Sequence, residues 1–343
     1  MMTVTPVSHA ASARRRRAAG GRLMVGLDVG GTKTACVVTD EHDEVLLREE
    51  VPTQPDRLAE QLAGLVRSAA ARVAASGVSG SLAAVGVAVP GHVESESGTV
   101  GLAVNLGGRE VALGPELERS VGLPCYVEHD ARAAAAWLFE RAGAGRDLAY
   151  VSLGTGISAG IVLDGQLLRG PNGLAGEIGH VSADPAGRTC ACGLLGCLET
   201  VAAGPAIARL ARSAVAAGRP TSLASDATAG DVFLAAADGD AMAVELTATV
   251  AEWLGRAIRG LLYTVGVRHV IIGGGVAAAG DALLEPLLRA IAQERAASPL
   301  ADAVFAQTEL ELLPPGADAG ARGAAAIARR RLDANDGEGV GER

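Results

Sequence analysis

One histidine and three closely spaced cysteines form the most informative group of potential ligands in the sequence. His180 precedes the run Cys190-Ala-Cys192-Gly-Leu-Leu-Gly-Cys197, whose two glycines let a short loop fold tightly. One imidazole and three thiolates suit a tetrahedral Zn²⁺ site, and four protein ligands leave no open coordination position. We therefore predict a structural zinc ion bound by His180, Cys190, Cys192 and Cys197, in preference to three reduced cysteines in an ordinary loop.

Three glycine-rich turns follow short apolar runs and could bind phosphate. They contain Asp28, Gly30, Gly31, Thr32 and Lys33 in the first turn, Gly154, Thr155 and Gly156 in the second, and Gly274 and Gly275 in the third. Glycines let the backbone approach an anion, and successive N–H groups form a phosphate-binding nest. Thr32 adds a hydroxyl donor, Lys33 adds charge, and Asp28 is expected to face a metal on the nucleotide. The spacing is neither a Walker A loop nor a Rossmann fingerprint. One such turn is typical of an ordinary hairpin, but three together predict a nucleotide site.

Asp130 follows a short predicted strand at 125–127 and opens an alanine-rich helix. Aspartate is a good helix N-cap, and that structural role alone would explain its position. The functional alternative is a general base, which accepts the proton of a substrate hydroxyl as that hydroxyl attacks the γ-phosphate of a nucleotide. Position alone leaves both interpretations open.

The elements expected around these residues repeat in the two halves of the chain. In the first half, apolar runs predict strands at 23–29, 34–39, 44–51 and 82–89, and a helix at 56–75. In the second half, strands are predicted at 148–153, 158–163, 166–168, 269–272 and near 310, and helices at 205–217, 241–265, 282–294 and 319–331. Asp164-Gly165 is a strong hairpin signal. Two related halves, each opening with strands around a glycine turn, indicate an α/β bilobed actin-like ATPase (ribonuclease H-like) fold, with two related domains around a cleft and a small zinc-binding loop.

The expected domain boundaries follow from this layout. Residues 1–22 are predicted to be a flexible N-terminal tail, and residues 332–343 a disordered tail. The N-terminal α/β lobe is predicted to comprise residues 23–128 plus 319–331. The C-terminal α/β lobe is predicted to comprise residues 129–318, with the zinc loop at 180–197.

Composition limits the class of protein. A chain of 343 residues is long enough for two domains. The formal net charge of −9 argues against a broad nucleic-acid surface, and no run of 18 apolar residues predicts a membrane span. The basic run Arg14–Arg17 is interpreted as part of a flexible tail, since no apolar signal-peptide segment follows it. An odd number of cysteines with one tight cluster favours a metal site in a reducing cytoplasm over a disulfide framework.

These motifs together resemble the bacterial ROK family (repressor, open reading frame, kinase). The stretch from Glu177-Ile-Gly-His180 through Cys197-Leu-Glu199 is similar to the ROK signature, and residues 28–33 are similar to the family's first phosphate motif. The resemblance extends from about residue 23 to residue 331. It implies an actin-like fold, use of ATP with Mg²⁺, and phosphorylation of a hexose or N-acetylhexosamine on its primary hydroxyl. It also implies a homodimer or homotetramer.

The resemblance also implies roles for individual residues. Asp130 matches the family's catalytic base, and Asn105 matches an asparagine that contacts the sugar. Glu177 and Glu199 match carboxylates that hold sugar hydroxyls, and His180 matches a residue that binds zinc and touches the sugar. Gly91 lies in the turn that the family places beside the sugar. His129 stands where the family usually has asparagine, so we expect its ring to reach the sugar and to affect the choice of substrate.

Four functions are compared. The first is an ATP-dependent hexose kinase, with glucose as the expected substrate, and the second is an N-acetylglucosamine or N-acetylmannosamine kinase. The third is a sugar-responsive transcription repressor of the same family, which the short stretch before the first predicted strand disfavours. The fourth is a non-catalytic sugar sensor, which Asp130 and the intact glycine turns disfavour. The sequence does not identify the sugar, because that depends on the shape of the pocket.

Overall fold

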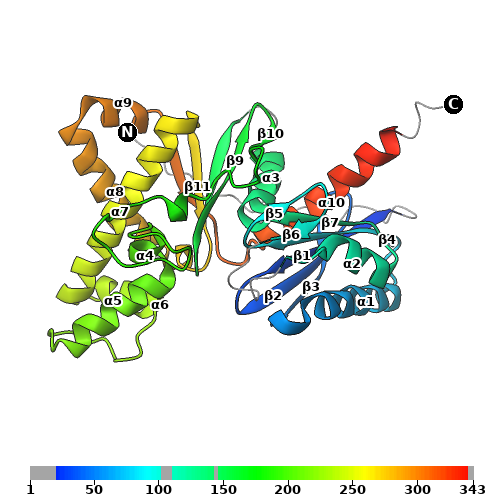
Figure 1. Ribbon diagram of the computed structural model, residues 1–343, viewed down its shortest axis with the longest axis horizontal. Helices are drawn as coiled ribbons and strands as arrows, with labels where there is room; N and C mark the ends of the chain where they lie inside the picture. Colours follow the sequence, from blue (N-terminus) through cyan, green and yellow to red (C-terminus); the bar gives the residue numbers. More distant parts are fainter. Residues whose placement is uncertain (1–20, 102–109, 143–145, 339–343) are drawn as a thin grey trace. The chain divides into compact units, whose positions relative to one another are not determined.

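A computed structural model describes residues 21–101, 110–142 and 146–338 of the chain (Figure 1). Contacts divide these residues into two compact units, each described by itself. The β1 unit comprises the described residues of 21–146 together with 160–175 and 318–338, and the β8 unit comprises residues 147–159 and 176–317. Among the described residues, no helix is both long and apolar enough to cross a membrane.

The β1 unit is built on a five-stranded sheet of order β3-β2-β1-β4-β7. Its strands are β1 (Arg22–Val29), β2 (Lys33–Thr39), β3 (Val45–Pro52), β4 (Ser81–Val89) and β7 (Cys125–His129), and β5 (Val93–Glu94) pairs with β6 (Thr99–Val100) separately. β1 to β3 are antiparallel, whereas β4 and β7 continue the sheet in parallel with β1. Parallel strands bring their carboxyl ends to one edge, so residues that end β1 and follow β7 can meet there.

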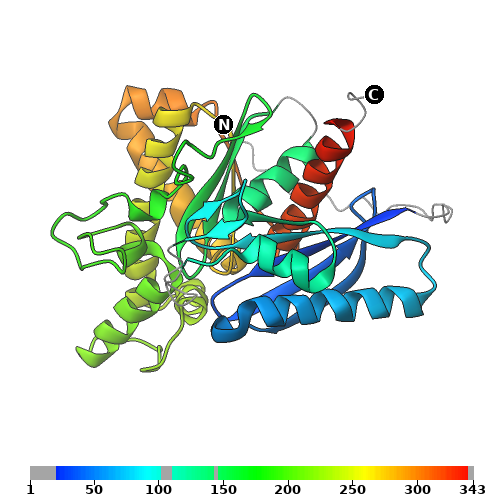
Figure 2. The same ribbon diagram turned by 45° about the vertical axis from the view of Figure 1, so that its right-hand side comes forward.

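Helices cover both faces of this sheet (Figure 2). On one face, α1 (Leu58–Ser76) and α2 (Leu113–Val121) join Val, Leu and Cys side chains of the strands in the main apolar core. On the other face lie α10 (Ala319–Glu338) and α3 (Asp130–Ala142), whose buried residues are mostly alanine. Small side chains allow these two helices to pack closely on each other and on the strands.

Glycines in β1 and β4 make this close approach possible. A Cβ atom on Gly26 would overlap the carbonyl oxygen of Ala321, and one on Gly86 would overlap that of Ala324, both in α10. Neither backbone group can move without moving the helix.

We expect Gly86→Ala to lower the free energy of unfolding by about 1–3 kcal/mol, because it overpacks a closed interface. Gly64→Ala in α1 is the matched control, since apart from its chain neighbours and the backbone of its own helix nothing lies within 4 Å of the added carbon. It should leave stability unchanged or raise it by up to about 1 kcal/mol. Urea unfolding measures both, and equal midpoints for the two variants would contradict the packing argument.

The second five-stranded sheet has the matching strand order, β10-β9-β8-β11-β12. Its strands are β8 (Leu148–Leu153), β9 (Ile157–Leu163), β10 (Gln166–Leu167), β11 (His269–Gly273) and β12 (Glu309–Leu312), and the chain leaves the β8 unit within β9. β8, β11 and β12 are parallel. Asp164 and Gly165 both have positive φ, at 49° and 75°, and join β9 to the antiparallel β10, which confirms the predicted hairpin. Repetition of one topology in two sheets is the actin-like arrangement predicted from the sequence.

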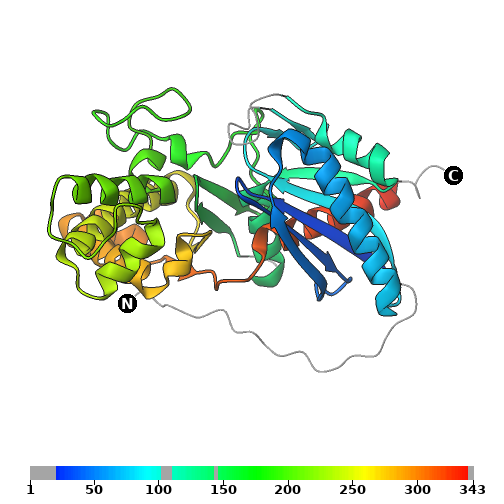
Figure 3. The ribbon, with the colours of Figure 1, turned by 90° about the horizontal axis from the view of Figure 1, so that it is seen from below.

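Helices make up most of the rest of the β8 unit (Figure 3). They are α4 (Glu199–Ala202), α5 (Gly204–Ala216), α6 (Ala229–Ala237), α7 (Ala241–Val265), α8 (Asp281–Ala297) and α9 (Pro299–Phe305). The helix predicted at 241–265 is confirmed with the same bounds, whereas α2, α6 and α9 were not predicted.

Two boundaries differ from those predicted. Disorder from residue 332 is wrong for residues 332–338, because α10 continues to Glu338. Leu332 packs against the apolar cluster of Met24, Ala84, Ala325 and Ala328, and Asp336 accepts a hydrogen bond from Arg22. Residues 130–142 and 160–175, placed by the sequence in the C-terminal lobe, belong to the β1 unit. Their placement follows from packing, since α3 lies along α10 and the Cα of Gly160 lies against the backbone of Ala131.

Candidate active site and metal centre

Two aspartates predicted from the sequence interact at the carboxyl edge of the β1 sheet. Asp28 is the penultimate residue of β1, and Asp130 is the first residue of α3, directly after β7. The pKa of Asp28 is raised to about 7, chiefly by burial and also by the charges of Asp130 and Asp318, against the opposing charge of Lys33. Asp318, directly before α10, was not predicted, and its carboxylate accepts a hydrogen bond of 2.8 Å from Arg48 Nε. A cation at this edge would relieve the repulsion between the carboxylates.

The raised pKa of Asp28 has a consequence for stability in the absence of nucleotide. A carboxyl group whose pKa rises from 3.8 to about 7 on folding stabilises the protein fully below pH 4, and this contribution is lost as the pH rises through 7. We expect Asp28→Asn to remove a fall in stability between about pH 4 and 7 worth at most about 4 kcal/mol. Thermal unfolding across this range measures it, and identical pH profiles for the two proteins would contradict the assignment.

Asp130 is not arranged as a helix N-cap. Its Oδ1 accepts the N–H of Ala131, the next residue, at 2.6 Å. A capping side chain instead bonds an amide two or three residues further along the chain. The carboxylate is 29% exposed and lies 3.2 Å from Nδ1 of His129, whose ring is only 6% exposed. The histidine therefore sits beside the candidate base, in a buried position.

The first glycine turn is tight and open to solvent. The amide of Gly30 donates to the carbonyl of Lys33 at 2.9 Å, and a Cβ atom on Gly30 would come within 3.0 Å of that same oxygen. Gly31, Thr32 and Lys33 are exposed, and Lys33 Nζ lies 3.0 Å from Glu50. The turn leaves backbone amides accessible, as an anion site requires.

The second and third glycine turns lie together in the β8 unit. A Cβ atom on Gly154 would lie 3.7 Å from the amide nitrogen of Gly275, and the carbonyl of Gly154 accepts the N–H of Gly204 at 2.8 Å. Gly274 has φ of +91° and lies against the backbone of Leu153, so no other residue fits there without strain. Thr155 and Gly275 are exposed, and Gly156 is partly buried. Two turns distant in sequence therefore form one backbone-lined surface at the start of α5.

The four predicted zinc ligands converge in the β8 unit, where the loop that carries them extends beyond the helices (Figure 3). Their ligand atoms all lie within 4.8 Å of one another. Cys190 Sγ is 3.7 Å from His180 Nδ1, and Cys192 Sγ is 3.6 Å from Cys197 Sγ. These separations suit atoms that share one tetrahedral ion with bonds of about 2.0–2.3 Å. The loop glycines 193 and 196 have φ of +92° and +67°, which only glycine adopts without strain.

The second nitrogen of His180 faces two carboxylates. Its Nε2 lies 4.0 Å from Glu177 and 3.9 Å from Glu199. Burial raises the pKa of Glu199, while its Oε1 accepts the amide of Ile157 at 3.2 Å. A Cβ atom on Gly156 would come within 2.9 Å of the same oxygen. The imidazole thus links the cysteine cluster to a pair of carboxylates, and Glu199 links that pair to the second glycine turn.

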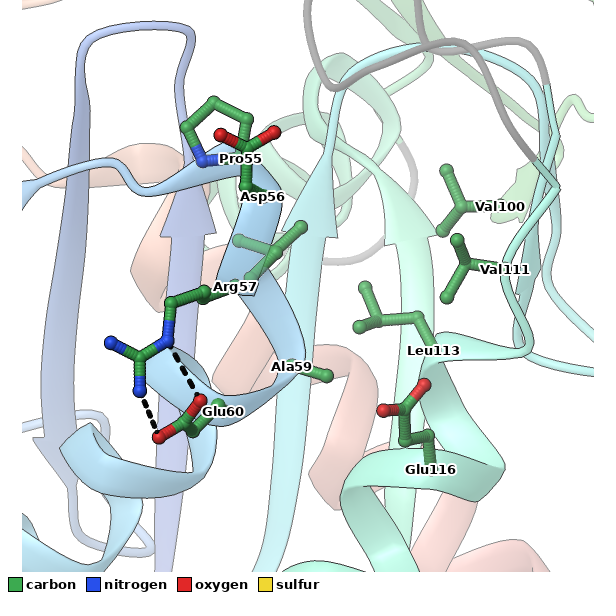
Figure 4. Close-up of a pocket in the computed structure, with 10 residues that line it drawn as sticks. Pro55, Asp56, Arg57, Ala59, Glu60, Val100, Val111, Leu113 and Glu116 are labelled. Carbon is green, nitrogen blue, oxygen red and sulfur yellow. Dashed lines mark hydrogen bonds and ion pairs between the residues drawn. The ribbon is translucent and has the colours of Figure 1, made fainter.

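Gly91 and Asn105 are the remaining residues that the sequence predicts to lie beside the sugar. Gly91 lies in the turn after β4 with φ of +100°, whereas Asn105 lies outside the described residues. A cavity of about 360 Å³ in the β1 unit lies between the start of α1 and the start of α2 with the residues just before it (Figure 4). Its lining includes the Arg57–Glu60 pair, Val111 and Leu113, and none of the predicted site residues.

Comparisons with known proteins identify the family of this chain. The family model described as ROK family matches residues 24–331. A glucokinase of Halalkalibacterium halodurans is 37% identical over 287 residues, which cover 78% of this chain and 84% of the relative. An N-acetylmannosamine kinase of Citrobacter koseri is 36% identical and covers 89% of this chain and 98% of the relative.

Solved structures give the same family. A ROK family glucokinase from Streptomyces griseus, in complex with glucose and AMPPNP, is 31% identical with a TM-score of 0.75 over 90% of this chain and 99% of that chain. A ROK family transcriptional regulator, a homologue of the E. coli MLC protein, is 29% identical with a TM-score of 0.79, over 91% of this chain and 79% of that chain.

Proposed function

Because this chain belongs to the ROK family, we propose that it is an ATP-dependent hexose kinase that phosphorylates the primary (6-) hydroxyl of glucose. The observation that carries the proposal is the Asp130 carboxylate. It is partly exposed at the end of β7, it is not engaged as an N-cap, and it lies close enough to Asp28 to raise the pKa of that carboxyl. A carboxylate in this place can accept the proton of an attacking hydroxyl.

The glycine turns are proposed to bind the nucleotide. The exposed residues Gly31, Thr32 and Thr155, with Gly274 and Gly275, offer backbone donors to phosphate oxygens and close backbone approach to the nucleoside. Asp28 is suited to hold Mg²⁺ on the nucleotide, and when bound that ion neutralises charge on the phosphates. Phosphoryl transfer requires mainly positioning and charge neutralisation, so the remaining task for Asp130 is to take one proton.

The sugar is proposed to be held by Glu177, Glu199 and His180, together with Gly91, Asn105 and His129. Carboxylates accept hydrogen bonds from sugar hydroxyls, and the Nε2 atom of His180 lies about equally far from both carboxylates of the β8 unit. The same histidine would bind zinc through Nδ1, so a structural Zn²⁺ fixes the ring that faces the sugar. The convergence of His180, Cys190, Cys192 and Cys197 supports this ligand set.

A screen for sugar-dependent ADP formation tests the proposal directly. Glucose, mannose, fructose, N-acetylglucosamine and N-acetylmannosamine are compared at equal concentration with MgATP. We expect glucose to give the highest kcat/KM. ADP formation that no sugar stimulates would overturn the kinase assignment.

N-acetylmannosamine kinase is the second candidate, since a relative of that name is nearly as similar over most of its length. Glucose and N-acetylmannosamine differ at the 2-position, where the acetamido group of N-acetylmannosamine needs more room than the hydroxyl of glucose.

We expect His129→Asn to change the ratio of kcat/KM between glucose and N-acetylmannosamine by about 10-fold, because it replaces a buried ring beside the base with a smaller amide. The ratio is measured in the same screen. An unchanged ratio would show that His129 does not affect the choice of sugar.

Assembly and location are further proposals. We infer a homodimer or homotetramer in the cytoplasm, on the strength of the family resemblance and the reduced cysteine cluster. A repressor function is the other known role in the family, and it predicts specific DNA binding without sugar-dependent ADP formation.

A further inference from the structure

A buried carboxylate lies two residues before the candidate base. Glu128 is 1% exposed, at the end of β7, and both of its oxygens accept hydrogen bonds. Oε1 accepts the N–H of His129 at 2.9 Å, Nε of Arg132 at 2.7 Å and the hydroxyl of Ser95 at 3.0 Å. Oε2 accepts Nε of Arg169 at 2.8 Å. One side chain therefore holds the backbone at the strand–helix junction and an arginine in the first turn of α3.

Arg132 extends these interactions from α3 to two neighbouring segments. It is 1% exposed, and its NH1 donates to the carbonyl of Gly173 at 2.7 Å. Its NH2 lies 3.5 Å from the carbonyl of Val93 in β5. Gly173 lies in the segment that leads to Glu177. The carboxylate and guanidinium thus fix the residues on both sides of Asp130, within the β1 unit.

The charges of Arg132 and Arg169 keep the buried Glu128 carboxylate ionised. Burial alone would raise the pKa of Glu128, but the guanidinium groups of Arg132 and Arg169 outweigh it and hold the pKa below its usual value. Glu128 is therefore ionised at neutral pH and accepts charge-assisted hydrogen bonds. Loss of its charge would leave Arg132 buried without a counterion.

We propose that Glu128, acting with Arg132, is a positioning residue that holds the β7–α3 junction so that the Asp130 carboxylate meets the substrate hydroxyl. The proposal rests on the proposed role of Asp130 as base. Glu128 itself touches neither substrate nor nucleotide. A base displaced by about 1 Å can lose about 100-fold in rate, so loosening this junction affects turnover and leaves the glycine turns intact.

The first experiment compares Glu128→Gln with Ser95→Ala. Each removes part of the same hydrogen-bond set, but Ser95→Ala leaves the Glu128 carboxylate and its bonds to His129 and Arg132 in place. We expect Glu128→Gln to lower kcat by about 10- to 100-fold with the KM for ATP unchanged within about threefold. Ser95→Ala should change kcat by less than about threefold. A folded Glu128→Gln protein with wild-type turnover would overturn the proposal.

A second variant tests whether the loss of turnover in Glu128→Gln arises only from a loss of stability. In Glu128→Leu/Arg132→Met an apolar pair replaces the ion pair, an exchange that often preserves stability. Arg169, 34% exposed, can then be solvated. Because the His129 amide then lacks its acceptor, we expect kcat to stay lowered by about 10- to 100-fold, at a melting temperature no lower than that of Glu128→Gln. Turnover that returns with stability would show that the role is structural only, and would contradict the proposal.

A cycle with Asp130→Asn separates this inference from the proposed function. If Glu128 acts through Asp130, the double variant Glu128→Gln/Asp130→Asn should have the kcat of Asp130→Asn alone. An equal further loss in that background would contradict the inference and leave the base assignment standing. Wild-type turnover in Asp130→Asn would show that the base assignment has failed, and the inference with it.

Discussion

Asp130→Asn is expected to lower kcat by about 10²–10⁴-fold while ATP binding is retained. Asparagine keeps the shape of the side chain but cannot accept the proton of the sugar hydroxyl. The nucleotide should still bind, because the glycine turns proposed to hold it do not include Asp130. The KM for the sugar should rise modestly, since the carboxylate also hydrogen-bonds the hydroxyl that it activates.

The control for this substitution is Asp333→Asn in α10, whose carboxylate is 57% exposed and lies 3.6 Å from Arg22 at the start of β1. It makes the same chemical change in the same unit, at the opposite end of β1 from the carboxyl edge, and should leave kcat unchanged. A purely structural role for Asp130 as an N-cap predicts that turnover stays intact and that stability changes little, because asparagine caps a helix about as well as aspartate. Steady-state kinetics and urea unfolding of the two variants distinguish these outcomes.

Removal of the zinc ion is expected to have the second large effect. A purified chain should contain about one equivalent of zinc, and chelation should lower both stability and the affinity for sugar. An ion present at 1,000 times its Kd contributes about 4 kcal/mol to the folded state. The affinity for sugar should fall because His180 would no longer be held between the cluster and the carboxylates of Glu177 and Glu199.

Cys197→Ser and Cys125→Ala form the matched pair for this prediction. Both cysteines are buried, but Cys125 lies outside the cluster. Cys197→Ser should lower the zinc content and the melting temperature, whereas Cys125→Ala should keep full zinc. Elemental analysis and calorimetry measure both quantities. A protein without zinc, or one whose activity and melting temperature are indifferent to a strong chelator, would contradict the assignment.

The features that sequence predicted well depend on local chemistry. The turn at Asp164-Gly165 and the convergence of His180 with three cysteines follow from residue types at fixed short spacings. The helix at 241–265 was found because its apolar residues recur at helical spacing along its length.

The features that sequence missed depend on contacts between distant segments. Asp318 carries no motif, and it becomes part of the candidate site only because α10 begins at the carboxyl edge of the β1 sheet. The partners of Glu128 come from residues up to 41 positions away. The last residues of α10 have a polar composition typical of a tail. Leu332 nevertheless packs against the apolar cluster that includes Met24, and Asp336 accepts a hydrogen bond from Arg22, so the helix continues. Tertiary packing overrides local composition at such places.

The most direct test of the central claim is identification of the product formed from ATP and glucose. Incubation of the protein with MgATP and glucose, followed by ³¹P NMR, should show glucose 6-phosphate and ADP in equal amounts as the γ-phosphate signal of ATP declines. Formation of inorganic phosphate alone, or no change in the ATP signals with any of the five sugars, would contradict the account.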